Sequence, residues 1–148
     1  MPKITRTALV SHTPEQMFEL VNNFASYPEF LPWCSGARVI SATEQEIIGE
    51  LQIQKGSIRQ QFATRNTLFP PHRIDLSLVS GPFRSLSGNW RFDAAGDSGC
   101  RVQLELEFEF SGRIIAMAIG AVFSQIAGSL VDAFCERADR LYADSNAG

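Results

Sequence analysis

The feature that most constrains the fold is a series of strand-like segments separated by very short breaks. The breaks are polar or contain glycine and proline, as turns do. Parallel strands need a crossover of about a dozen residues or more, and these breaks are shorter. The sequence therefore predicts consecutive antiparallel strands, after an earlier strand at 3–10. The segments are 36–43, 46–55, 57–68, 72–80, 85–94 and 100–110.

Alternation within these segments predicts a sheet with one apolar face. In 100–110, every second residue from Val102 to Phe110 is apolar, and the residues between them are polar. This period of two is typical of a strand that covers a core on one side. We therefore interpret the row Glu105, Glu107 and Glu109 as a solvated face, in preference to a pair of carboxylates for acid chemistry.

Helices are predicted on both sides of this strand series. Thr13-Pro14-Glu15-Gln16 is a capping-box start, with proline at the first helical position, and the helix ends near Asn22. The aromatic segment 27–34 contains two prolines, which limit it to a turn of helix and a loop. A long helix runs from Ser111-Gly112 to about Tyr142.

The long helix is unusually apolar in its first half. Residues 114–131 carry no charge, which is at the threshold for a membrane span. A helix buried by its own domain is favoured, because polar residues interrupt the run and an amphipathic segment follows. Residues 114–123 are apolar all round, so this half is covered on more than one side, lines a cavity or touches a membrane, and we expect a ligand there first. The element order predicts an α+β fold, in which a curved sheet wraps around this helix.

Composition narrows the class of protein. The chain has 148 residues, a net charge of −3 and a sequence pI of about 5.4. We expect a single domain over 1–148, with no global basic field and no DNA partner. The three cysteines lack metal-ligand spacing and no signal peptide opens the chain, which predicts reduced thiols and a cytoplasmic protein.

Residues suited to catalysis are scarce. The two histidines, His12 and His72, have no metal-ligand neighbours at standard spacing, and we expect both in exposed loops. No nucleophile, phosphate-binding or metalloprotease motif is present, so the sequence predicts a protein that is not an enzyme and has no metal site.

Two groups of polar residues lie on the segment 57–68 and its neighbours. If Phe62 points inward, then Gln60, Thr64 and Asn66 do too. They either hydrogen-bond to neighbouring backbone or water, or orient the polar head of a ligand in an apolar pocket. The other face of this strand and its neighbours points away from the core. It either contacts RNA or another anionic surface, or is a solvated, ion-paired face. Its arginines are Arg59, Arg65, Arg73 and Arg91.

Several motifs together resemble a known family. They are Ser-Tyr-Pro-Glu-Phe-Leu-Pro-Trp-Cys at 26–34, Ala-Thr-Arg-Asn at 63–66, Leu-Val-Ser-Gly-Pro-Phe at 78–83, Gly-Asn-Trp-Arg-Phe at 88–92 and Phe-Glu-Phe at 108–110. The chain resembles the coenzyme Q-binding and ribosome-association toxin branch of the polyketide cyclase, START-like superfamily. The resemblance implies a helix-grip fold of seven antiparallel strands and a cavity for ubiquinone or another isoprenoid lipid.

Two functions follow from this resemblance. The first is a non-catalytic quinone chaperone in respiration, with ubiquinone as a bound ligand, no other cofactor and transient contact with the inner membrane. The alternative is a type II toxin–antitoxin toxin that binds the large ribosomal subunit and blocks subunit association. A polyketide cyclase-like enzyme is a weaker alternative. The residues expected around a ligand are Tyr27, Phe30, Leu31, Trp33, Gln60, Phe62, Thr64, Asn66, Phe83, Trp90, Phe108, Phe110, Ile114, Met117, Ala118, Ala121 and Val122.

Overall fold

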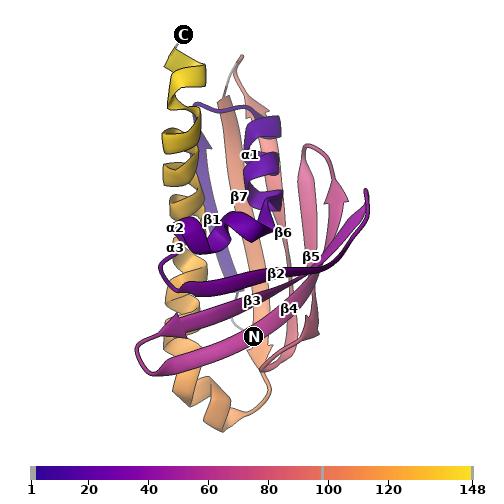
Figure 1. Cartoon of the computed structure of the whole chain (residues 1–148), viewed down its shortest axis with the longest axis vertical. Helices are drawn as coiled ribbons and strands as arrows, with labels where there is room; N and C mark the ends of the chain where they lie inside the picture. Colours follow the sequence, from indigo (N-terminus) through magenta and orange to yellow (C-terminus); the bar gives the residue numbers. More distant parts are fainter. Residues whose placement is uncertain (1–2, 98, 148) are drawn as a thin grey trace.

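A computed structural model describes residues 3–97 and 99–147 and shows the α+β fold that the sequence predicts (Figure 1). The helical elements and the strands occur in the expected order along the chain. They are β1 (Lys3–Val10), α1 (Pro14–Asn22), the 3-10 helix η1 (Phe24–Ser26), α2 (Tyr27–Phe30), β2 (Cys34–Ala42), β3 (Glu46–Lys55), β4 (Ile58–Phe69), β5 (Arg73–Ser80), β6 (Phe83–Ala95), β7 (Gly99–Phe110) and α3 (Arg113–Ala147).

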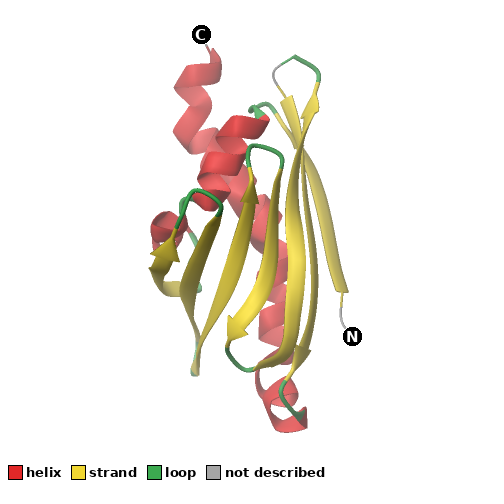
Figure 2. Cartoon of the chain, turned by 90° about the vertical axis from the view of Figure 1, so that its right-hand side faces the viewer, coloured by secondary structure: helices red, strands yellow, loops and turns green. Residues whose placement is uncertain are grey.

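The strands form one antiparallel sheet in the order β1-β7-β6-β5-β4-β3-β2. Strands β2 to β7 are a meander, because each connection is too short for anything else, and β1 joins the far edge beside β7. Figure 2 shows the sheet on one side of α3, bent so that the helix lies in its concave face.

Local sequence signals mark most element boundaries correctly. Thr13 Oγ1 accepts a hydrogen bond from Gln16 N at 3.1 Å, and Gln16 Oε1 accepts one from Thr13 N at 2.9 Å, which confirms the capping box. Strand β6 begins at Phe83, earlier than residue 85, because the ladder with β7 continues to the pair Phe83 and Phe110.

The helix α3 is the core helix of this domain. Its residues Phe123, Ile126, Val131 and Phe134 are buried, and its main contacts are with β1, β7 and α1. By length and composition Arg113–Tyr142 could also cross a bilayer, a test that a mostly buried core helix passes as well, and 28% of its most apolar window is buried. Burial of the stripe from Phe123 to Phe134 against the sheet shows that this part of the helix is covered by its own domain.

The polar face of β7 is on the outside of the sheet, as expected. Glu107 Oε1 lies 3.9 Å from Lys3 Nζ on β1, and Glu109 Oε1 lies 3.2 Å from Arg84 Nη1 on β6. These ion pairs agree with a solvated face for the glutamate row.

The prediction of an exposed His12 is wrong. His12 is 3% exposed, its Nε2 lies 2.7 Å from Asp139 Oδ1, and its ring faces that of Tyr142. The reason is tertiary: the turn between β1 and α1 packs under the C-terminal part of α3, which the local sequence does not reveal. His72 is exposed, and its Nδ1 lies 3.1 Å from the carbonyl oxygen of Phe92.

Candidate functional site

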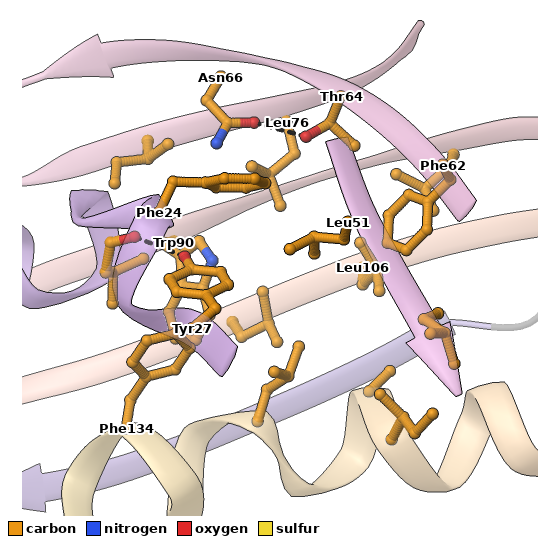
Figure 3. A pocket seen from close by; sticks show the side chains of 18 of the residues that line it. Phe24, Tyr27, Leu51, Phe62, Thr64, Asn66, Leu76, Trp90, Leu106 and Phe134 are labelled. Atoms are coloured by element: carbon orange, nitrogen blue, oxygen red, sulfur yellow. Dashed lines mark hydrogen bonds between the residues drawn. The ribbon is translucent and has the colours of Figure 1, made fainter. Parts of the chain in front are cut away.

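A cavity of about 80 Å³ lies between the sheet and α3 (Figure 3). The helix packs mainly on β1 and β7, so it leaves space over β3, β4 and β5, and the segment from α1 to α2 covers part of that space. The cavity lining is almost entirely apolar and aromatic. It consists of Val21, Phe24, Tyr27, Trp33, Leu51, Ile53, Phe62, Thr64, Asn66, Ile74, Leu76, Leu86, Trp90, Leu104, Leu106, Phe123, Ile126, Ala127, Leu130 and Phe134.

An aromatic wall closes one side of the cavity. The Tyr27 ring lies 5.0 Å from that of Phe24 and 5.2 Å from that of Phe134, and the Phe134 ring lies 5.3 Å from that of Trp90. The latter two contacts are edge-to-face, an arrangement that aromatic quadrupoles favour. This wall joins the η1–α2 segment to α3 and β6, so the aromatic sequence at 27–33 supplies the cover of the cavity.

The polar feature of the cavity is a buried pair on β4. Thr64 Oγ1 donates to Asn66 Oδ1 at 2.8 Å, and the two residues are 7% and 8% exposed. They share the inward face because they are two positions apart on a strand. In Figure 3 the Asn66 nitrogen lies on the side of the amide away from Thr64. This arrangement offers an N–H donor to a ligand oxygen, such as a carbonyl.

The described lining is uncharged. No carboxylate, imidazole or amine is among the residues that the structure describes around the cavity. The Tyr27 hydroxyl donates to the carbonyl oxygen of Val21, and burial, with a smaller effect of Cys34, raises the pKa of Tyr27 well above its usual range. The phenol therefore stays neutral, and the cavity suits an uncharged, mainly hydrocarbon ligand.

Some of the residues expected around a ligand lie in this cavity and others do not. The inward orientation of Thr64 and Asn66 is confirmed, whereas Gln60 is half-buried and lines a separate polar groove beyond the cavity. Phe30 and Leu31 line the outer side of the α2 segment, against the later turns of α3. The expected residues in the lining are Tyr27, Trp33, Phe62, Thr64, Asn66 and Trp90.

The expectation that the first half of α3 lines the cavity is wrong for most of its residues. Ile114 and Met117 are 82% and 86% exposed, Ala118 and Ala121 are also exposed, and Val122 is half-buried outside the lining. Figure 1 shows the first turns of α3 extending past the ends of the strands.

The space beside the middle of α3 is filled by aromatic side chains. The Phe123 ring lies 4.9 Å from that of Phe83, 4.8 Å from that of Phe108 and 5.9 Å from that of Phe110. This cluster separates the cavity from the first half of the helix. The cavity instead meets α3 from Phe123 to Phe134. The sequence signal for this contact is an apolar stripe at helical spacing.

Three of the four predicted surface arginines have polar partners. Arg65 Nε lies 3.0 Å from Glu46 Oε1, Arg73 Nε lies 3.1 Å from Asp75 Oδ1, and Arg91 Nε donates to Asn89 Oδ1 at 3.3 Å. The ion-paired alternative therefore holds for Arg65 and Arg73. Arg59 and Arg91 form no ion pair with a carboxylate among residues 3–97 and 99–142, whose side chains the structure describes.

The three cysteines are free thiols. Burial is the main cause that raises the pKa of Cys34, and it raises the pKa values of Cys100 and Cys135 to about 11, with nearby carboxylates adding to the effect. Thiols with raised pKa values stay protonated near neutral pH and are poor nucleophiles. Within the described residues no cluster of histidine, cysteine, aspartate or glutamate could hold a metal ion.

An antiparallel sheet that grips one long helix around an apolar cavity defines the START-like class of proteins. Residues 10–135 match the family described as polyketide cyclase / dehydrase and lipid transport, and the chain belongs to this family. Within it, the chain is 43% identical to the ribosome association toxin RatA of Pseudomonas aeruginosa over 139 residues, 94% of this chain and 96% of that protein.

More distant relatives support the fold and the family. A solution structure of an 18 kDa protein from Caulobacter crescentus is 33% identical, with a TM-score of 0.75 over 97% of this chain and 99% of that one. A mitochondrial coenzyme Q-binding protein, COQ10 homolog B of Xenopus laevis, is 26% identical over 86% of this chain and 54% of that protein. The Zhui aromatase/cyclase from Streptomyces has a TM-score of 0.82 at 14% identity over 94% of each chain, a likeness of fold alone.

Proposed function

We propose that this protein acts on the ribosome, binding the large subunit and hindering its association with the small one. The observation that carries the proposal is the 43% identity, over nearly the whole of both chains, to a protein named ribosome association toxin. Relatives from Vibrio cholerae and Escherichia coli with the same name are 43% and 41% identical over 97% of this chain. Such a function is cytoplasmic and needs no catalytic group, in keeping with the uncharged cavity.

Overexpression tests this proposal. We expect a bacterium that overproduces the protein to show less assembled ribosome and more free subunits on sucrose gradients, because a bound protein would occupy the joining surface of one subunit. The measurement is the ratio of free-subunit absorbance to assembled-ribosome absorbance. The control is the same ratio in cells that carry the gene with an early stop codon. An unchanged ratio at high expression would count against the proposal.

A second function, binding of an isoprenoid quinone, is favoured by the cavity itself. Its lining is hydrocarbon except for the Thr64–Asn66 pair, and burial of a polyisoprenoid tail there would be favourable by about 25 cal/mol per Å². A neutral amide donor matches the carbonyl oxygens of a quinone ring. The relative named coenzyme Q-binding protein agrees with this class of ligand.

The cavity must widen for such a ligand. An engineered cavity of about 150 Å³ accepts benzene, and this one has about 80 Å³. The lining side chains Leu51, Phe62 and Leu130 are half-buried, whereas most of the others are buried. We infer that ligand entry displaces these half-buried side chains.

Removal of the polar pair is expected to weaken quinone binding without unfolding the protein. A Thr64→Val, Asn66→Leu double variant makes both side chains apolar. No polar group is then left buried without a hydrogen-bond partner. A lost hydrogen bond to the ligand costs about 1 kcal/mol, and we expect a fivefold to tenfold rise in the Kd for ubiquinone, measured by quenching of tryptophan fluorescence.

The matched control is Thr67→Val, on the outer face of the same strand, which should leave the Kd unchanged. Absence of saturable ubiquinone binding by the wild-type protein, together with no lipid in its organic extract by mass spectrometry, would refute this second function.

A further inference from the structure

The β3–β4 hairpin carries an exposed polar cluster that the cavity does not explain. In the ladder, Gln54 pairs with Arg59 and Gln52 pairs with Gln61. Directly opposed residues of antiparallel strands lie on the same face, so the four side chains form a compact group, and all four are exposed. We call Gln52, Gln54, Arg59 and Gln61 the hairpin surface.

A polar groove of about 520 Å³ runs along the hairpin surface. Ser35 on β2 lies at one side, and the turn at Gly81 and Pro82 lies at the other. Strand β4 pairs with β5 only from Ala63 onward, so the stretch 58–62 forms no ladder with β5. The groove offers side-chain amides and a guanidinium together.

The electrostatics of the hairpin surface differ from those of the rest of the sheet. Residues 51–74 contain no aspartate or glutamate, although the whole chain has a net charge of −3. The nearest carboxylate along the same face of β3, Glu50, lies 3.6 Å from Arg38 Nη2. Lys55 at the hairpin tip donates to Gln125 Oε1 at 3.1 Å, which ties the hairpin to α3. Among the residues whose side chains the structure describes, Arg59 is thus a cation that forms no ion pair with a carboxylate.

We propose that the hairpin surface binds an RNA strand. A guanidinium binds phosphate oxygens in bidentate fashion, and glutamine side chains both donate and accept, so they suit phosphate, sugar hydroxyls and base edges together. A bilayer would need exposed apolar side chains, and none of the four residues of the hairpin surface is apolar. This inference rests on the proposed ribosomal function. It places the contact with the ribosome at the hairpin surface, because Arg65 and Arg73 are already ion-paired.

Two variants of equal composition test the inference. Arg59→Glu with Gln61→Glu introduces two carboxylates into the hairpin surface. Arg91→Glu with Gln103→Glu makes the same changes at a cross-strand pair of β6 and β7, on the outer face of the sheet. Binding to purified large ribosomal subunits is measured by pelleting through a sucrose cushion at several salt concentrations, and binding to protein-free RNA from the same subunits by filter retention.

We expect the hairpin variant to lose at least tenfold in affinity for both probes, and the slope of log affinity against log salt to fall by about 1. The control variant should bind as the wild type does. Equal binding by the two variants and the wild type would overturn the inference while leaving the ribosomal function in place. Failure of the wild type to bind subunits would overturn the ribosomal function, and failure to bind the free RNA as well would overturn both.

Two further outcomes are informative. If the hairpin variant loses affinity for subunits but keeps full affinity for free RNA, a ribosomal protein is the partner and the RNA assignment is wrong. If it instead loses binding to phosphatidylglycerol vesicles alone, the surface contacts anionic lipid and the assignment is equally wrong. Should the double variant fail to fold by circular dichroism, the single Arg59→Gln variant is expected to show a threefold or larger loss, and an unchanged affinity would contradict the proposal.

Discussion

Replacement of Phe134 with alanine is expected to lower the free energy of unfolding by about 3–5 kcal/mol. Phe134 is 1% exposed and its ring contacts those of Tyr27, Phe30 and Trp90, so it joins α3 to the α2 segment and to β6. Its removal costs the transfer free energy of the ring and leaves a void that the aromatic wall fills only in part. Urea unfolding followed by circular dichroism measures the change.

Leu141→Ala on the same helix is the matched control. Leu141 is 50% exposed, and we expect its truncation to change the free energy of unfolding by less than about 0.5 kcal/mol. A loss below about 1 kcal/mol for Phe134→Ala would mean that this wall is not part of the packed core. Because Phe134 lines the cavity, its truncation also enlarges the cavity. We therefore expect the variant to bind benzene-sized molecules.

Gly88→Ala is expected to cost about 3 kcal/mol or more, or to prevent folding. A Cβ atom at Gly88 would lie 2.1 Å from the carbonyl oxygen of Glu105 and 3.0 Å from Leu106 Cα, both backbone atoms of β7. Backbone in the middle of a sheet cannot move aside as a flexible side chain does, so β6 and β7 would have to separate. The yield of soluble protein and its midpoint of thermal unfolding are the measurements.

Gly112→Ala separates this steric effect from the general cost of replacing glycine. A Cβ atom at Gly112 meets nothing within 4 Å, and we expect its midpoint to stay within a few degrees of the wild-type value. Equal midpoints for the two variants would show that the strands are less closely paired at Gly88 than the structure indicates.

The architecture could be predicted because it is specified locally. Short breaks between strands allow only an antiparallel meander, and the alternation from Val102 to Phe110 assigns the faces of β7. The capping box at Thr13 and Gln16 marks the start of α1. Each of these signals involves residues close together in the chain, so no knowledge of the tertiary structure is needed.

The position of the cavity could be predicted only in part. Thr64 and Asn66 are recognisable as inward polar residues from their parity with Phe62. The place where α3 meets the cavity depends on which residues of β6 and β7 fill the space beside it, and Phe83 and Phe108 do so next to Phe123. That packing joins residues far apart in the chain and has no local signature.

The surface residues show the same limit. The arginines at 59, 65, 73 and 91 look equivalent in sequence. Glu46 lies beside Arg65 because β3 and β4 are in a particular register, and Asp75 lies beside Arg73 because both point outward from β5. Only the folded sheet distinguishes Arg59 from the ion-paired Arg65 and Arg73, and this distinction supports the proposed RNA contact.

If this START-like protein binds the large ribosomal subunit, as we propose, it should keep the small subunit away. The most direct measurement adds the purified protein to isolated subunits and follows their association by light scattering as the magnesium concentration is raised, with sedimentation to identify the subunit that carries the protein. We expect an equimolar amount of protein to suppress the rise in scattering and to sediment with the large subunit. An unaltered rise in scattering, with the protein left at the top of the gradient, would contradict it.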